Sequence, residues 1–330
     1  MGAVEPKERV ITQDSASDVR SSAPRVLVTG AFGFIGSSVC RRLMQSGAEI
    51  HGLSRAARSG DVMVHRRWSC DLADLTTTNR LLHAISPDYL IHLAGHVTGV
   101  RDEEEVAPTF RDDLMATVNV LSAATEVGCR RVVIAGSMDQ PTFATVDSAP
   151  GSPYAAAKWA GSLYARMYHL LYGLDVVILR IFMVYGPGQR DETKLVPYVI
   201  RCLLRGEPPD LTSGRRPVDW VYVEDVAEAV ALALHAPGVA GRTIDVGSGG
   251  SVEVRDIVER LVQLTDPQVR PRFGALKDRP LESTDVADLD ATRAVLGWEP
   301  RTTLEQGLRQ TVEWYVAEGK PGSAPTPART

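Results

Sequence analysis

Residues 25–36 read Arg-Val-Leu-Val-Thr-Gly-Ala-Phe-Gly-Phe-Ile-Gly, and this stretch decides the fold. Its apolar run, Val26–Val28, is typical of a parallel strand buried on both faces, and a helical pattern follows over residues 37–45. Gly30 allows a tight turn close to a pyrophosphate, and Gly36 allows the helix to pack closely on the strand, with the phosphates at the helix N-terminus. Because the strand precedes the glycines and the helix follows them, the motif predicts a dinucleotide site. The residues assigned to that site are Gly30, Phe32, Gly33, Phe34, Ile35 and Gly36.

The composition is that of an ordinary globular protein, with 330 residues of which 44% are hydrophobic and 23% charged. This length favours one large α/β domain with a smaller appended lobe. The net charge of -5 disfavours a general nucleic-acid binder. The four cysteines form no C-x-x-C pair, which predicts neither a metal site nor disulfides and fits a cytoplasmic protein. No apolar run reaches membrane-spanning length, and residues 1–24 and 319–330 are expected to be mobile tails.

Strand and helix patterns alternate along the chain, which predicts a parallel sheet covered by helices on both sides. The further strands expected after the first lie at residues 48–53, 62–67, 89–95, 131–135, 176–181, 219–223 and 242–246. The longer helices are expected at residues 106–127, 194–204, 224–235, 253–264 and 304–317. Two segments, Asp71-Leu72 and Leu93-Ala94-Gly95, fall where a cofactor would cross the edge of such a sheet, and we assign them to cofactor binding.

The segment after the second strand indicates which dinucleotide is bound. An NAD site usually has a carboxylate here for the ribose 2′-hydroxyl, whereas an arginine accommodates a 2′-phosphate. This chain has Arg55 and Arg58 here, and its next carboxylate is Asp61. The alternative is a pair of solvated loop arginines. We predict NADP rather than NAD, held by the two arginines.

Tyr154 and Lys158 are the candidates for proton transfer. They are four residues apart at the start of a predicted helix, and therefore share one face. A phenol has an unperturbed pKa near about 10, which a nearby ammonium group lowers. The tyrosine then exchanges a proton with a hydroxyl or carbonyl while hydride moves to or from a nicotinamide. Ser137, at the end of the strand over residues 131–135, is placed to hydrogen-bond the same oxygen.

With these motifs in view, the sequence resembles the extended short-chain dehydrogenases/reductases, in the branch that modifies nucleotide-activated sugars. The resemblance covers about residues 25–316. The motifs that carry it are Thr29-Gly30-x-x-Gly33-Phe34-Ile35-Gly36, Asp71-Leu72, His92-Leu93-Ala94, Ser137, Tyr154-x-x-x-Lys158, Arg180-x-x-x-Val184-Tyr185-Gly186-Pro187-Gly188, Asp219-Trp220-Val221-Tyr222-Val223-x-Asp225-Val226 and Leu296-Gly297-Trp298-x-Pro300.

The resemblance implies a Rossmann-like, doubly wound cofactor domain with a smaller C-terminal lobe for the nucleotide sugar. The cofactor domain is expected over residues 25–182 and again over 217–246, and the lobe over 183–216 and 247–318. It also implies a homodimer. The substrate contacts are assigned to Arg180, Met183, Lys194, Arg216, Arg279 and Glu282, with the arginines suited to a diphosphate.

Several positions depart from the family pattern. Relatives that dehydrate sugars usually carry Thr-Asp-Glu where this chain has Ser137-Met138-Asp139, so Asp139 is the one remaining acid and Met138 cannot transfer a proton. Met183 replaces a usual asparagine, and Asp113 occupies a position that is often asparagine. The redox residues are intact, so these departures bear on the substrate.

These features favour an NADP-dependent reductase that acts on the C4 ketone of a nucleotide-linked 4-keto-6-deoxyhexose, with Tyr154 as the proton donor. The first alternative is a 4-epimerase, or a dehydratase or decarboxylase, that retains its cofactor. The second is a non-catalytic NADP-binding protein, which the intact Tyr154 and Lys158 disfavour.

Overall fold

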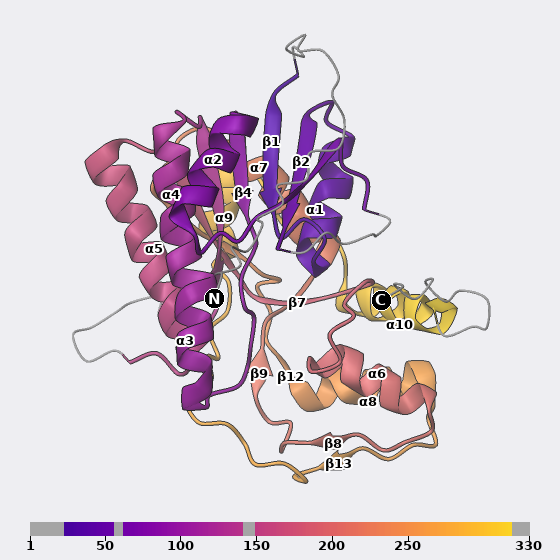
Figure 1. The fold of residues 1–330 in the computed structure, drawn as a ribbon. Helices are drawn as coiled ribbons and strands as arrows, with labels where there is room; N and C mark the ends of the chain where they lie inside the picture. The colour runs from indigo at the N-terminus through magenta and orange to yellow at the C-terminus, as the bar shows by residue number, and fades with distance from the viewer. Residues whose placement is uncertain (1–22, 56–61, 141–148, 319–330) are drawn as a thin grey trace, which may run out of the picture.

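The computed structural model describes residues 23–55, 62–140 and 149–318. Residues 1–22 of the tail predicted over 1–24, the whole tail predicted over 319–330, and the cofactor contact predicted for Arg58 lie outside the described residues. A seven-stranded parallel sheet forms the centre (Figure 1), in the order β11-β6-β5-β4-β1-β2-β3. Its strands are β1 (Arg25–Thr29), β2 (Glu49–Ser54), β3 (Arg66–Ser69), β4 (Tyr89–His92), β5 (Arg131–Ser137), β6 (Val176–Ile181) and β11 (Thr243–Val246). The strand order confirms the predicted doubly wound, Rossmann-like fold.

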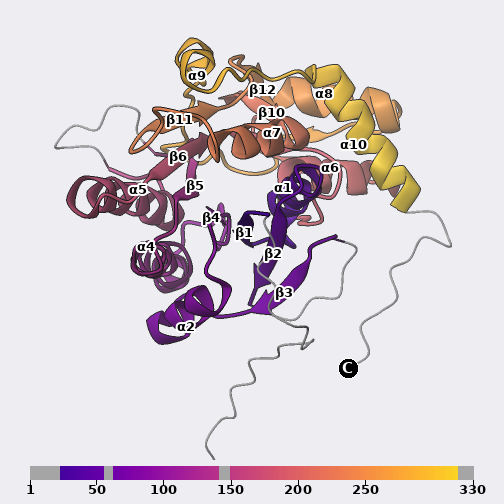
Figure 2. The same cartoon turned by 90° about the horizontal axis from the view of Figure 1, so that it is seen from above.

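Helices cover both faces of this sheet (Figure 2). One face carries α1 (Phe34–Met44) and α7 (Val223–Ala233), and the other carries α2 (Leu75–Ile85), α4 (Ala116–Glu126) and α5 (Pro153–Tyr172). Val26 and Val28 belong to the core under α1, whereas Leu27 belongs to the core under α2 and α4. Successive side chains of a strand point to opposite faces, so the apolar run of β1 supplies both cores at once.

A smaller group of elements lies beyond one end of the strands of the large sheet (Figure 1). It contains α6 (Leu195–Leu204), α8 (Val254–Thr265) and α10 (Leu304–Glu318). In contrast, α9 (Leu289–Leu296) packs against β11 and α7 on the large sheet. Three two-stranded pairings accompany α6, α8 and α10, namely β7 (Met183–Tyr185) with β10 (Trp220–Tyr222), β9 (Pro217–Val218) with β12 (Val252–Glu253), and β8 (Asp210–Leu211) with β13 (Arg272–Phe273). The chain crosses to these elements after β6 and returns to the large sheet at β11, which pairs with β6.

Three expectations about the elements are corrected. The third strand begins at Arg66 rather than Val62, because it pairs with β2 from His51 onward. The strand expected over 219–223 is the shorter β10, which pairs with β7 outside the large sheet. The helix expected over 106–127 is divided into α3 (Val106–Thr109), a π-helical turn η2 (Phe110–Met115) and α4, preceded by a short 3₁₀ turn η1 (Glu103–Glu105). A π-helical turn is frequently found at a functional site.

Candidate active site

The glycine-rich turn after β1 forms a cradle that side chains would fill. Gly30 has φ +67°, and a Cβ atom there would lie 2.8 Å from the backbone nitrogen of Ala94. A Cβ atom on Gly36 would lie 2.1 Å from the carbonyl oxygen of Gly30, so α1 can approach β1 only with glycine at this position. No side chain caps the N-terminus of α1 at Gly33, which leaves backbone N–H groups directed at the turn. This geometry suits a pyrophosphate, and it lies where the strand order reverses between β1 and β4.

A continuous cleft of about 3020 Å³ runs from this cradle to the smaller lobe. Single-ligand pockets measure roughly 300–1,000 Å³, so the cleft has room for a dinucleotide and a second ligand together. All four predicted catalytic residues line it, as do the six residues of the glycine-rich turn and Leu93, Ala94 and Gly95. Of the predicted substrate residues, the cleft is lined by Met183, Lys194, Arg216, Arg279 and Glu282.

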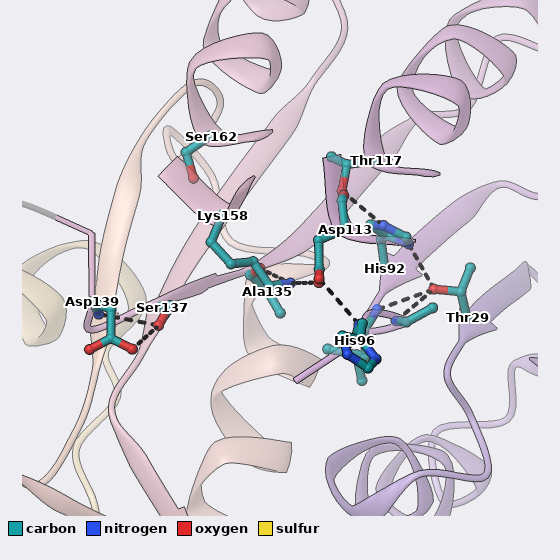
Figure 3. Close-up of polar contacts among 12 residues, drawn as sticks. Thr29, His92, His96, Asp113, Thr117, Ala135, Ser137, Asp139, Lys158 and Ser162 are labelled. Atoms are coloured by element: carbon teal, nitrogen blue, oxygen red, sulfur yellow. Dashed lines mark hydrogen bonds and ion pairs between the residues drawn. The ribbon is translucent and has the colours of Figure 1, made fainter. Parts of the chain in front are cut away.

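Lys158 lines the cleft, with only 8% of its side chain exposed. Figure 3 shows the side chain directed toward Asp113 and Ala135. Lys158 lies in the first turns of α5. Ser152 caps the N-terminus of this helix, because its side chain accepts a hydrogen bond from the Ala155 N–H. Lys158 Nζ donates to the carbonyl oxygen of Ala135 at 3.2 Å and lies 5.8 Å from the centroid of the Tyr154 ring. The predicted face shared by Tyr154 and Lys158 is therefore present.

Ser137, the last residue of β5, and Asp139 line the same cleft as Tyr154 and Lys158. Figure 3 shows Ser137 and Asp139 together to one side of Lys158. The Asp139 N–H donates to Ser137 Oγ at 3.2 Å, and Ser137 Oγ is 3.5 Å from Asp139 Oδ2. The sequence predicted that Lys158 lowers the pKa of Tyr154, but in the protein alone that pKa is raised. The main cause is burial, followed by the negative charges of Asp113 and Asp139, while a hydrogen bond with Ser137 acts in the opposite direction. Tyr154 is thus held as a neutral phenol, which can donate a proton.

Asp113 is a residue of this site that the sequence did not predict. The π-helical turn η2 directs its carboxylate toward Lys158, with Oδ1 at 3.6 Å from Nζ, and the side chain is fully buried. Its Oδ2 accepts a hydrogen bond from the His96 N–H at 3.3 Å. The pKa of Asp113 is raised, chiefly by burial, and the charge of Lys158 and the hydrogen bond from the His96 N–H act in the opposite direction by favouring its ionised form. The sequence showed that an aspartate occupies position 113, which is often asparagine. It did not predict the contact of Asp113 with Lys158, because that contact depends on the π-helical turn η2, which the hydrophobic periodicity does not indicate.

The predicted cofactor residues Arg55, Asp71 and Leu72 do not line the cleft. Arg55 forms an ion pair with Asp112, and Asp71 forms one with Arg111. Arg111 also donates to Asp112 at 2.6 Å, so the four charged residues form a chain across the end of β2 and the η2 turn. Sequence reasoning missed Arg111 and Asp112, because they belong to a helix distant in sequence from the second strand.

The substrate side of the cleft contains a positively charged region formed by Lys194 and Arg279. Lys194 Nζ donates to the Val97 carbonyl at 3.0 Å, and burial together with the charge of Arg279 lowers its pKa against the opposing effect of Asp191. Within the described ranges, Arg279 has no carboxylate at ion-pair distance.

Two other predicted arginines are held by acidic partners. Arg216 pairs with Glu282 at 3.0 Å, so these two predicted ligands bind each other. Arg180 does not line the cleft; it is 5% exposed and forms a bidentate ion pair with Asp245 at 2.6–2.7 Å. The structure therefore places Arg180 between β6 and β11 rather than at the predicted substrate site.

The fold, the glycine cradle and the Ser137, Tyr154 and Lys158 set together define the extended short-chain dehydrogenase/reductase class. A family model described as the NAD dependent epimerase/dehydratase family matches residues 26–247, and the chain belongs to this family. It is therefore an enzyme, in the branch whose relatives act on nucleotide sugars. This sets aside the alternative of a non-catalytic protein.

Three similar proteins illustrate the relationship. UDP-glucose 4-epimerase of Mycolicibacterium smegmatis is 30% identical over 88% of this chain and 98% of its own length. A probable dTDP-glucose 4,6-dehydratase of Sinorhizobium fredii is 31% identical over 89% of this chain and 93% of its own length. The solved structure of UDP-glucose 4-epimerase from Thermus thermophilus in complex with NAD superposes with a TM-score of 0.77 at 29% identity, covering 88% of this chain and 99% of that one.

A nicotinamide dinucleotide is the cofactor class of this family, and the cradle around Gly30 and Gly36 fits its pyrophosphate. No helix in the described part of the chain combines the length and apolar character needed to cross a bilayer. The same residues contain no group of three or more histidine, cysteine or acidic side chains placed to hold a metal ion.

Proposed function

We propose that the enzyme is an NADP-dependent reductase acting on the C4 ketone of a nucleotide-linked 4-keto-6-deoxyhexose. The observation that supports this choice is the arrangement at the end of β5. Met138 is 4% exposed and its N–H donates to the Ile181 carbonyl, so it fixes the loop but cannot transfer a proton. Dehydration needs an acid and a base beyond the tyrosine, whereas reduction needs only one proton donor.

In this proposal Tyr154 donates a proton to the carbonyl oxygen of the sugar, and Ser137 Oγ hydrogen-bonds the same oxygen. A bound reduced nicotinamide supplies the hydride. Lys158, which lines the cleft, positions the nicotinamide end of the cofactor. Burial and the adjacent carboxylates hold Tyr154 protonated, as a donor requires. The positive region formed by Lys194 and Arg279 is assigned to the diphosphate of the substrate, because guanidinium and ammonium groups suit phosphate oxygens.

A second candidate is a 4-epimerase that retains its cofactor. One curated relative and one solved structure that are named UDP-glucose 4-epimerase support this candidate. An epimerase must use Tyr154 as a base in one half-reaction and as an acid in the other. A reductase must exchange its oxidised cofactor for NADPH at every turnover, and Arg55 suits NADPH, which is why we place the reductase first.

The reaction is tested by incubating the protein with NADPH and dTDP-linked 4-keto-6-deoxyglucose. We expect NADPH to be consumed in proportion to the sugar reduced, because hydride leaves the cofactor in every turnover. In parallel, dTDP-glucose should yield no 4-keto product. Absorbance at the NADPH band and chromatography of the sugar nucleotides measure both outcomes. Interconversion of UDP-glucose and its C4 epimer without a net change in NADPH would instead establish the epimerase.

The preference for NADP is assigned to Arg55, which directly follows β2 and pairs with Asp112. We expect Arg55→Asp to weaken NADPH binding by on the order of tenfold to a hundredfold, since a hydrogen bond to a charged group contributes roughly 1.5–3 kcal/mol, and to leave NADH binding little changed. Fluorescence titration of both cofactors measures this. Arg130→Asp is the matched control, because Arg130 also pairs with an aspartate, Asp88, but precedes β5 at the opposite end of the strands. Equal affinity of the unchanged protein for NADH and NADPH would contradict the assignment.

We also retain a homodimer and a cytoplasmic location as predictions. Several large apolar side chains are exposed on α5 and η2, namely Phe110, Met115, Leu163, Leu170 and Leu171. An exposed apolar surface of this kind supports the prediction of self-association. The described cysteines are all free and buried, as suits a reducing compartment.

A further inference from the structure

Asp113 is an unusual group to find behind the lysine of this site. Its side chain is fully buried and its Oδ1 accepts no hydrogen bond from the described residues, although Lys158 Nζ lies 3.6 Å away. Gly95 is what leaves space for the carboxylate, because a Cβ atom on Gly95 would lie 2.3 Å from Oδ1. A buried carboxylate with an incompletely satisfied oxygen costs free energy, so the contact with Lys158 is a feature that requires an explanation.

The position of Asp113 sets the charge that Tyr154 experiences. A lone ammonium 5.8 Å from the phenol ring would favour the phenolate. A carboxylate 3.6 Å from the same ammonium opposes that field, because the two charges form a pair with little net charge. Lys158 can then still donate hydrogen bonds, as it does to Ala135, while its effect on the tyrosine is reduced.

We propose that Asp113 is an ionised counter-charge to Lys158 that keeps Tyr154 in its neutral, proton-donating form. Asp113 acts through Lys158 and is thus a positioning residue. Its consequence for the enzyme, a bias toward reduction over oxidation of the sugar, rests on the proposed reductase function. The effect on the tyrosine itself does not depend on which sugar is bound.

The other charged and titratable groups near Lys158 and Asp113 have partners other than the Lys158 ammonium. Burial and the charge of Lys158 lower the pKa of His92, at the end of β4, to about 3, so His92 is neutral; it bonds Thr29 and Thr117. His96 directs its ring toward Glu105, with Nε2 2.7 Å from a carboxylate oxygen. Asp139 contacts Ser137 rather than Lys158. Asp113 is thus the carboxylate placed against the ammonium itself within the described residues.

The test is a pH titration of the tyrosinate absorbance band with saturating NADP⁺ and without any sugar. The chain has nine tyrosines, so each protein is compared with its own Tyr154→Phe version and the difference reports Tyr154 alone. We expect Asp113→Asn, which is nearly isosteric, to lower the titration midpoint of Tyr154 by about one pH unit or more. The positive charge of Lys158 then has no carboxylate beside it to offset it, and it favours the phenolate. At a fixed alkaline pH such a lowering of the midpoint corresponds to about a tenfold increase in the ratio of phenolate to phenol.

Asp112→Asn is the matched control. It removes the same charge one residue away, from a side chain that pairs with Arg55 and Arg111 instead of Lys158, and it should leave the midpoint unchanged. Asp113→Ser provides a second, smaller replacement if the asparagine variant does not fold, as judged by its melting temperature. An unchanged midpoint in the Asp113 variants, or an equal shift in Asp112→Asn, would overturn the proposal. A lowered midpoint in a protein that reduces no 4-keto sugar would overturn the proposed reaction and leave the role of Asp113 standing.

Discussion

Tyr154→Phe is expected to lose turnover by roughly 10²- to 10⁴-fold, the range contributed by a positioned proton donor. The substitution removes only the phenol oxygen, and the ring still lies over Lys158 Nζ in the first turns of α5. We therefore expect the melting temperature and NADPH binding to remain close to those of the unchanged protein. Initial rates of NADPH oxidation with the 4-keto sugar, together with a cofactor titration, measure the two effects separately.

Tyr164→Phe is the control for this experiment. Tyr164 lies on the same helix, is 40% exposed and does not line the cleft, so loss of its hydroxyl should leave the rate unchanged. If Tyr154→Phe retains full turnover, the proton donor is another group. Asp139 is then the first candidate, because it lines the cleft beside Ser137, and Asp139→Asn in the Tyr154→Phe background would identify it.

Much of the cofactor side of the fold could be predicted because its determinants are local. The run Val26–Val28 and the glycines after it specify a buried strand, a turn and a close helix within one short stretch. The parallel strands that follow are each a short apolar segment, and their bounds agree closely at β2, β5 and β6. Tyr154 and Lys158 also share a helix face by spacing alone.

The remaining features depend on contacts between segments that are distant in sequence. Of the short strands, β10 was expected from the sequence, over residues 219–223. The strands β7 to β9, β12 and β13 contain two or three residues each, too few to show a periodicity. The η2 turn interrupts a helix whose apolar pattern continues through it, and this interruption brings Asp113 to Lys158. Arg180 was predicted at the substrate site from its residue type, but its position in β6 places it opposite Asp245 in β11.

Asp219 shows how such distant contacts also hold the smaller lobe together. Its side chain is fully buried between β9 and β10 and accepts four hydrogen bonds. Oδ1 accepts from the N–H and the hydroxyl of Ser248, and Oδ2 accepts from the N–H groups of Gly249 and Ala287. One carboxylate thereby fixes the loop after β11 and the segment before α9 to the strand that crosses between the lobe and the sheet.

We expect Asp219→Ala to lower the free energy of unfolding by about 3 kcal/mol or more, because buried donors left without an acceptor each cost roughly 1–3 kcal/mol. Asp219→Asn should restore little of this, since its NH₂ group would face two of the four donors wherever it points. Urea unfolding followed by circular dichroism measures both variants. Asp210→Asn is the control, because its ion pair with Arg272 is exposed and such pairs contribute about 0–1 kcal/mol. If Asp219→Ala lowers the free energy of unfolding by only about 0–1 kcal/mol, the smaller lobe is held by its apolar core instead.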